Sequence, residues 1–291
     1  MSERVATIGM VGAGTMGTGI AQVAILAGLR ILLYDAVGAA LAKGRARIAQ
    51  NVSRGVGQGL VQPDAAEEAL RRLVAVTHLS EMRGAEFILE STSEDLSSKQ
   101  RLFAELTEVA DPGAILATNT SCLSITAIGM ATRRPERMVG MHFFRPVAVN
   151  PLVEVVEGQR TDPDIVKEAM AIARRLGKTP VRAKDTPGFI VNRIARHFSL
   201  EALRILGEGG VSHDRIDRAM KGPGRFPMGP FELMDLVGID VSFATGSSVY
   251  EGFFHEPRFR PHPLERRMVD SGLLGRKTGR GFYGYPDAES G

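Results

Sequence analysis

The sequence contains a single cysteine among its 291 residues, Cys122. One thiol cannot form an internal disulfide, and it cannot build a metal site out of several cysteines. No stretch approaches the ~18 consecutive apolar residues of a membrane-spanning helix, so we expect no membrane segment. The first residues also lack a basic region followed by an apolar stretch and a cleavage site, which argues against secretion. These absences predict a protein of the reducing cytoplasm.

The excess of positive charge is small, because 36 Lys and Arg stand against 33 Asp and Glu for a net charge of +3. Such an excess does not indicate a nucleic-acid partner. It would suit an anionic substrate that carries phosphates, and a solvated basic surface explains it equally well. The contents of 44% hydrophobic and 24% charged residues are typical of a globular enzyme.

Strand-like and helix-like segments alternate through the first two thirds of the chain. Strands are expected at 5–11, 30–34, 86–90, 114–118, 137–143, 152–156 and 179–184, and helices at 15–28, 36–54, 64–73, 95–110 and 163–176. This alternation predicts an α/β fold with a parallel, doubly wound sheet of the Rossmann type.

The pattern changes near residue 186, where Thr186 can cap a helix that begins at Pro187. Only helical segments follow, at 188–207, 212–221, 229–236, 240–250 and 262–272. We therefore predict two domains. Residues 1–185 form a nucleotide-binding domain, and residues 186–291 form an all-α domain.

A glycine-rich motif, G-x-G-x-x-G, separates the first expected strand from the first expected helix. Its glycines permit a tight turn, a close approach of pyrophosphate to the backbone, and close helix–strand packing. The expected cofactor contacts of this segment are Gly12, Gly14, Thr15, Met16 and Gly17. Asp35 ends the second strand, where a carboxylate binds ribose hydroxyls and repels a 2′-phosphate. The motif and Asp35 therefore predict NAD rather than NADP. The alternative is that residues 12–17 form only a tight turn between strand and helix and bind no ligand.

His142 ends one expected strand, and Glu154 lies twelve residues later in the next expected strand. So short a connection allows the two side chains to meet, and a carboxylate on one ring nitrogen would fix the tautomer and favour the protonated ring. The other nitrogen could then take a proton from a hydroxyl while hydride leaves the same carbon. Glu154 could instead face solvent at the end of its strand.

Several ordered motifs extend over nearly the whole chain. Besides the glycine motif they are Ala-Thr-Asn-Thr-Ser at 117–121, His-Phe-Phe at 142–144, Leu-Val-Glu-Val at 152–155, Asp-Thr-Pro-Gly-Phe-Ile-Val-Asn-Arg at 185–193, Pro-Met-Gly-Pro-Phe-Glu-Leu at 227–233 and Gly-Arg-Lys-Thr-Gly-Arg-Gly-Phe-Tyr at 275–283. In these segments the sequence resembles the L-3-hydroxyacyl-CoA dehydrogenase family, which includes 3-hydroxybutyryl-CoA dehydrogenases. The resemblance implies an NAD-dependent enzyme of fatty-acid β-oxidation that acts on an acyl-CoA and dimerises through its helical domain.

The resemblance also implies roles for individual residues. Four side chains match catalytic positions: His142, Glu154, Ser121 and Asn192. Three more match NAD contacts: Glu94, Lys99 and Asn119. Without the resemblance, Ser121 would be a turn residue, Asn192 an ordinary helix position, and Glu94 with Lys99 an exposed charge pair.

Substrate contacts are expected among cationic side chains, because the CoA phosphates need them. Lys43 and Arg47 are candidates on the helix after Asp35, although a solvated helix face explains each of them as well. Arg145 departs from the asparagine that most of the family carries before this proline. It could turn outward, pair with Glu154, or bind the distal carboxylate of a dicarboxylic acyl-CoA.

Two other functions remain open at this point. One is a hydroxyacid dehydrogenase that acts on a substrate without CoA, although such enzymes use a lysine that residues 188–196 do not contain. The other is a catalytically impaired, NAD-binding relative.

Overall fold

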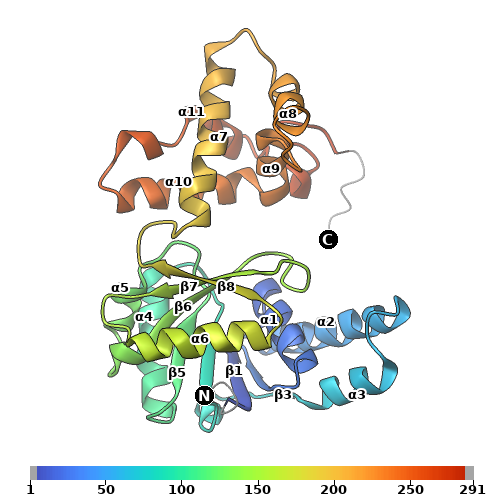
Figure 1. Ribbon diagram of the computed structural model, residues 1–291, viewed down its shortest axis with the longest axis vertical. Helices are drawn as coiled ribbons and strands as arrows, with labels where there is room; N and C mark the ends of the chain where they lie inside the picture. Colours follow the sequence, from blue (N-terminus) through green and yellow to red (C-terminus); the bar gives the residue numbers. More distant parts are fainter. Residues whose placement is uncertain (1–4, 286–291) are drawn as a thin grey trace. The chain divides into compact units, whose positions relative to one another are not determined.

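The computed structural model describes residues 5–285, which divide into two compact units between Thr186 and Pro187. Figure 1 labels their helices and strands. No helix among residues 5–285 is long and apolar enough to cross a membrane.

The first unit is built on one sheet of eight strands in the order β3-β2-β1-β4-β5-β6-β7-β8. The strands are β1 Thr7–Val11, β2 Arg30–Tyr34, β3 Leu73–Ala75, β4 Phe87–Glu90, β5 Ile115–Thr118, β6 Met138–Phe143, β7 Leu152–Glu157 and β8 Thr179–Lys184. The central strands are nearly continuous apolar runs, as expected for a sheet that is covered on both faces. The α/β prediction is confirmed.

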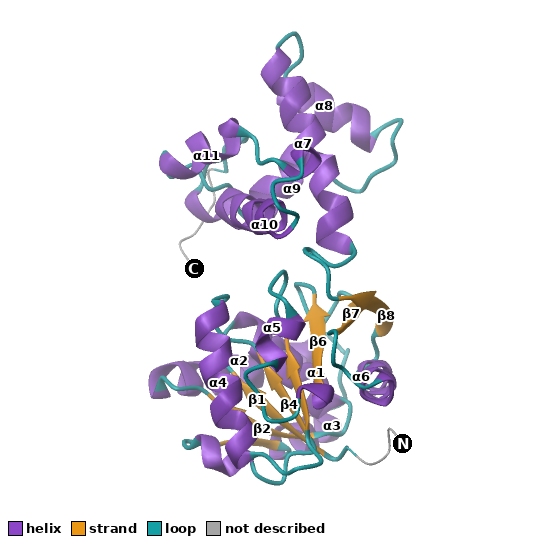
Figure 2. Ribbon diagram, turned by 90° about the vertical axis from the view of Figure 1, so that its left-hand side faces the viewer, coloured by secondary structure: helices purple, strands orange, loops and turns teal. Residues whose placement is uncertain are grey.

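Helices cover both faces of this sheet (Figure 2). They are α1 Thr15–Leu26, α2 Gly38–Gly57, α3 Pro63–Arg71, α4 Leu96–Val109, α5 Ile125–Gly129 and α6 Pro163–Arg175. Helix α1 packs on α2 and α3, α4 packs on α5, and α6 packs on β6, β7 and β8. Three of the helices begin at side chains that cap them, since Asp95, Ser124 and Asp162 each accept a backbone N–H of the first turn.

One strand departs from the parallel arrangement that the sequence predicts. Strand β7 runs antiparallel to β6, whereas the other neighbouring pairs are parallel. Residues 144–151 join β6 to β7 directly, and a parallel pair would need a longer crossover connection. Short strand β3 was not predicted, because its three residues directly follow a helical segment.

Alternation along β6 and β7 divides their side chains between the two faces of the sheet. Met141 and Val153 belong to the apolar core that also contains residues of α1 and α6. His142 and Glu154 are the next residues along each strand, so they face the other side. The strand pattern therefore brings two polar side chains together on one face of the sheet, on the neighbouring strands β6 and β7.

The second unit is helical within its described residues. Its helices are α7 Val191–Glu208, α8 His213–Lys221, α9 Pro230–Val237, α10 Ile239–Gly252 and α11 Pro263–Asp270. The expected helix start at Pro187 is wrong. Gly188 and Phe189 adopt positive φ angles of 74° and 49°, which a right-handed helix does not allow, so α7 begins only at Val191.

Two buried carboxylates hold the last described segment of this unit. Asp235 accepts the backbone N–H groups of Phe282 and Tyr283 at 3.0 and 2.9 Å and the hydroxyl of Tyr285 at 3.0 Å. Asp217 accepts the Tyr283 hydroxyl at 2.8 Å. Both carboxylates are 1% exposed, so these bonds satisfy charges that would otherwise be buried at high cost.

Candidate active site

The glycine motif forms the turn between β1 and α1. Gly12 has a φ of 105°, and a Cβ atom there would lie 2.4 Å from the carbonyl oxygen of Ser91. At Gly17 a Cβ atom would lie 1.9 Å from the carbonyl oxygen of Gly12. A Cβ at Gly14 would meet no atom of the protein within 4 Å. Two of the glycines are therefore required by the fold, whereas Gly14 faces open space beside the start of α1.

Asp35 follows β2 and is anchored by two backbone bonds. Its Oδ2 accepts the N–H of Ala13 at 2.8 Å, and its Oδ1 accepts the N–H of Val37 at 2.9 Å. These bonds fix the carboxylate at the edge of the sheet beside the glycine turn. Each oxygen retains a further lone pair, which can accept a hydroxyl of a ligand.

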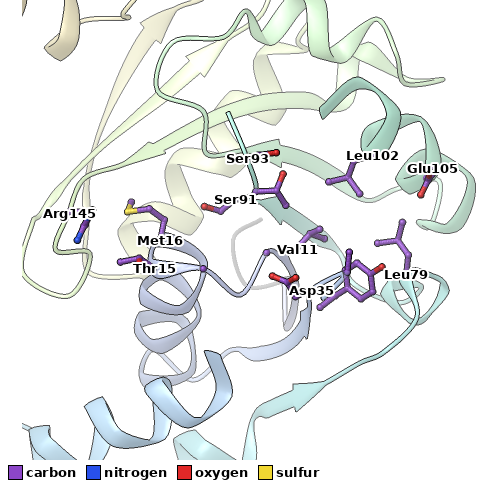
Figure 3. A pocket seen from close by; sticks show the side chains of 15 residues that line it. Val11, Thr15, Met16, Asp35, Leu79, Ser91, Ser93, Leu102, Glu105 and Arg145 are labelled. Carbon is purple, nitrogen blue, oxygen red and sulfur yellow. The ribbon is translucent and has the colours of Figure 1, made fainter. Parts of the chain in front are cut away.

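A cavity of about 600 Å³ opens above the glycine turn (Figure 3). It is lined by Val11, Gly12, Gly14, Thr15, Met16, Tyr34, Asp35, Ala36, Leu79, Ser91, Thr92, Ser93, Leu102, Glu105 and Arg145. The cavity thus joins the start of α1, where helical N–H groups point outward, to the carboxylate of Asp35. This combination fits a dinucleotide, with phosphates at the helix start and a ribose at the carboxylate.

A buried ion pair lies beneath the cavity wall. Lys99 Nζ donates to Glu90 Oε1 at 2.6 Å, and the two side chains are 1% and 0% exposed. Glu90 also accepts the hydroxyls of Thr118 at 2.6 Å and Thr92 at 2.7 Å. Because Thr92 lines the cavity, Glu90 fixes part of its wall. Glu90 was not predicted from the sequence, although a charged residue at the end of an apolar strand is a signal of a buried polar site.

Glu94 binds the turn after β5 and does not line the cavity. Its Oε1 accepts the Thr120 hydroxyl at 2.6 Å, the Ser121 N–H at 2.8 Å and the Ser121 hydroxyl at 3.1 Å. Burial alone would raise the pKa of Glu94, but Lys99 and these hydrogen bonds together lower it below its usual value. Glu94 is therefore an anion that orients Ser121, and Lys99 lies 3.6 Å from its Oε2.

Asn119 connects the ends of three strands. Its Nδ2 donates to Ser91 Oγ at 3.1 Å, and its Oδ1 accepts the backbone N–H of Phe143 at 2.8 Å. Ser91 lines the cavity and Phe143 follows His142, so Asn119 couples the cavity to the end of β6.

His142 and Glu154 lie directly opposite each other in the register of β6 and β7. Side chains at such cross-strand positions are close neighbours. His142 Nδ1 and Glu154 Oε2 are 2.7 Å apart, and the two residues are 7% and 1% exposed. The ring of Phe144 lies 4.3 Å from that of His142, centre to centre. A carboxylate thus holds Nδ1 and fixes the orientation of the ring.

The remaining predicted residues lie on three different segments of the chain. Arg47 lies on α2, and its Nη1 is 3.4 Å from Thr15 Oγ1, whereas Lys43 on the same helix is exposed. Arg145 lines the cavity and forms no ion pair with Glu154, whose carboxylate binds His142. Asn192 is the second residue of α7, in the second unit.

Two family models together match almost the full length of the chain. Residues 7–186 match the NAD binding domain of 3-hydroxyacyl-CoA dehydrogenase, and residues 188–285 match its C-terminal domain.

Individual relatives agree with this match. The chain is 43% identical over 283 residues to a 3-hydroxyadipyl-CoA dehydrogenase of Escherichia coli, covering 97% of this chain but only 60% of that relative. It is 39% identical over 287 residues to a 3-hydroxybutyryl-CoA dehydrogenase of Mycobacterium tuberculosis, covering 98% of this chain and 100% of the relative. The crystal structure of an (S)-3-hydroxybutyryl-CoA dehydrogenase from Ralstonia eutropha superposes with a TM-score of 0.94 at 37% identity, covering 97% of this chain and 100% of the other.

Proposed function

The chain belongs to the 3-hydroxyacyl-CoA dehydrogenase family, and we propose that it oxidises the 3-hydroxyl group of an (S)-3-hydroxyacyl-CoA to a ketone. The reverse reaction reduces a 3-oxoacyl-CoA. The observation that carries this proposal is the buried contact of 2.7 Å between His142 Nδ1 and Glu154 Oε2. Such a pair at the end of a strand is suited to moving the proton of a hydroxyl group.

NAD is the cofactor of the family's first domain, and when bound it accepts the hydride from C3 of the substrate. The residues of this chain hold it in ways that follow from their placement. The N–H groups at the start of α1 bind its phosphates, since no acidic side chain lies in the first turn. Asp35 binds the adenosine ribose and disfavours a 2′-phosphate by charge repulsion.

His142 is the acid–base group in this proposal. Its Nε2 takes the proton of the 3-hydroxyl while the C3–H bond breaks. The loss of the O–H and C3–H bonds leaves the C=O double bond of the ketone. Glu154 stabilises the imidazolium that forms, because its carboxylate stays bonded to Nδ1. In the reverse direction the imidazolium returns the proton to the oxygen.

Ser121 and Asn192 are proposed to hold the substrate oxygen. Glu94 accepts the Ser121 backbone N–H at 2.8 Å, which fixes the turn that carries the serine. The Ser121 hydroxyl, 3.1 Å from Glu94, would turn its proton to the substrate oxygen when substrate binds. An amide such as Asn192 can donate to an oxygen that gains negative charge. Substitution of either residue by alanine is therefore expected to lower kcat more than it changes NADH binding.

The test of the substrate class compares NADH consumption with acetoacetyl-CoA and with free acetoacetate, followed at 340 nm. We expect turnover of the thioester and a kcat/KM at least ~10²-fold lower for the free acid. Equal rates would favour a hydroxyacid dehydrogenase instead. NADH binding with no turnover of either compound would favour a catalytically impaired relative.

We further propose that two copies associate through the helical unit. Helices α7, α9 and α10 carry large apolar side chains in water, among them Ile194 at 67%, Leu236 at 49% and Val241 at 47% exposure. A contiguous apolar patch is characteristic of interfaces, and the proposal is that these side chains form one. Light scattering should give the mass of a dimer, and Ile194→Asp should lower it. Leu60→Asp, at a 77% exposed position of the first unit, serves as the control.

For the cellular role, we propose the β-oxidation of fatty acids in the cytoplasm. The single cysteine suits a reducing compartment, and the proposed substrate is a β-oxidation intermediate. Fractionation of cells that express the chain at its natural level tests the location.

A further inference from the structure

The cavity above the glycine turn has one cationic side chain in its wall, that of Arg145. The other charged residues that line it are Asp35 and Glu105, both acidic. A dinucleotide carries its negative charge on the pyrophosphate that links its two halves. Among residues 5–285, no hydrogen bond or ion pair engages the Arg145 guanidinium, and the side chain is exposed.

The backbone around Arg145 is firmly held against α1. Val147 is 4% exposed and belongs to the apolar core, and a Cβ atom on Gly19 of α1 would lie only 3.1 Å from its side chain. Lys178 Nζ donates to the carbonyl oxygens of Val147 and Asn150. The segment that carries Arg145 is therefore fixed on the side of α1 where the helix begins.

This placement brings Arg145 to the glycine turn. In Figure 3 its guanidinium lies next to Thr15 and Met16, and the contact between Val147 and Gly19, one turn further along α1, agrees with that view. His142 faces the side of the sheet that α1 and α6 do not cover, although only two residues separate it from Arg145. His142 and Arg145, three residues apart, therefore lie toward opposite faces of the sheet, and each can have a separate role.

The start of α1 is suited to an anion, and Arg47 of α2 lies beside it with its Nη1 3.4 Å from Thr15 Oγ1. No side chain caps the helix, and its first turn contains no acidic residue. Its outward N–H groups approach a phosphate from one side. Arg145 approaches from another side with planar donors that match phosphate oxygens in pairs.

We propose that Arg145 is a cofactor-binding residue, which closes on the pyrophosphate of NAD opposite the N–H groups of the glycine turn. The inference uses the NAD site of the family and does not depend on which acyl-CoA is oxidised. It differs from the three alternatives that the sequence left open, in which Arg145 turns outward, pairs with Glu154 or binds the distal carboxylate of a dicarboxylic acyl-CoA.

The test measures dissociation constants by NADH fluorescence for the wild type, Arg145→Asn and Arg145→Lys, with displacement by ADP-ribose and by adenosine. Arg160→Asn is the matched control, because Arg160 is exposed and does not line the cavity. Loss of a charge-assisted bond to phosphate should weaken NADH and ADP-ribose roughly 5- to 10-fold in Arg145→Asn. Adenosine, which lacks phosphates, should bind as before, and raising the salt concentration should weaken NADH less in this variant than in the wild type.

An unchanged NADH constant in Arg145→Asn, with an unchanged melting temperature, would overturn the proposal. If the variant instead loses its preference between 3-hydroxyadipyl-CoA and 3-hydroxybutyryl-CoA at unchanged NADH affinity, Arg145 binds the substrate. Arg145→Lys keeps the charge and should recover part of the affinity, which separates loss of charge from misfolding. A wild type that fails to bind NADH would refute the NAD site itself.

Discussion

Replacement of Lys99 by methionine should destabilise the first unit strongly. The substitution leaves the Glu90 carboxylate, which is fully buried, without the ammonium group 2.6 Å away. Removing one partner of a buried ion pair costs ~3–5 kcal/mol, because the other charge stays buried without compensation. For a unit of this size, that cost lowers the melting temperature by roughly 6–20 °C.

The double variant Glu90→Gln/Lys99→Met separates this effect from simple loss of packing. It removes both charges and keeps one oxygen, which can accept one of the two hydroxyls that Thr118 and Thr92 donate to the separate oxygens of Glu90. Its loss of stability should therefore be smaller than that of Lys99→Met alone.

Differential scanning calorimetry of the full chain measures these changes. Arg101→Met on the same helix is the control, since Arg101 is exposed and bonds only to serines of α4. A loss below ~1 kcal/mol in Lys99→Met, or a double variant less stable than the single one, would refute the reasoning.

The other predictions concern the glycine turn, the cofactor choice and pH. Gly14→Ala should keep the melting temperature but weaken NADH several-fold, because a Cβ there meets no protein atom within 4 Å and would meet only a bound ligand. Gly17→Ala should fail to fold, because its Cβ would lie 1.9 Å from the Gly12 carbonyl oxygen. Fluorescence titration and calorimetry distinguish the two. Asp35→Ser should raise NADPH affinity relative to NADH by roughly 10-fold or more, and an unchanged ratio of the two constants would contradict the role of Asp35. Burial, and the charge of Asp235, raise the pKa of Tyr285 to about 12. Since this lies above the ordinary value near 10, its bond stabilises the helical unit fully below about pH 10 and is lost as the pH rises toward 12. Melting temperatures between pH 9 and 11.5 should fall more steeply for the wild type than for Tyr285→Phe, and parallel curves would exclude this contribution.

The parts of the fold that depend on local pattern were predictable from the sequence. The alternation of strands and helices and the glycine motif are encoded in neighbouring residues, and so is the series of five helices after residue 190. The start of α7 was not predictable, because Thr186 and Pro187 are typical of a helix start while the positive φ angles of Gly188 and Phe189 arise only in the folded turn.

The candidate site was predictable where one strand pairing decides the geometry. The connection between His142 and Glu154 is too short for a crossover, so their strands must pair antiparallel. The alternation of side chains along each strand then places both residues on one face of the sheet. Glu90 and Lys99 form a buried pair through the approach of α4 to the end of β4, which no spacing rule along the chain reveals. Likewise, Arg145 lines the nucleotide cavity because its loop packs on α1 through Val147, a contact between distant segments that the sequence does not reveal.

The most direct test of the account is the rate of acetoacetyl-CoA reduction by His142→Gln, measured together with its NADH dissociation constant. The variant should lose at least ~10²-fold in kcat while it binds NADH as the wild type does, because His142 moves the proton and does not line the nucleotide cavity. Glu157→Gln, which removes a carboxylate of β7, the strand that carries Glu154, should retain the wild-type rate. A His142→Gln enzyme of near wild-type activity would contradict the assignment of His142 as the acid–base group.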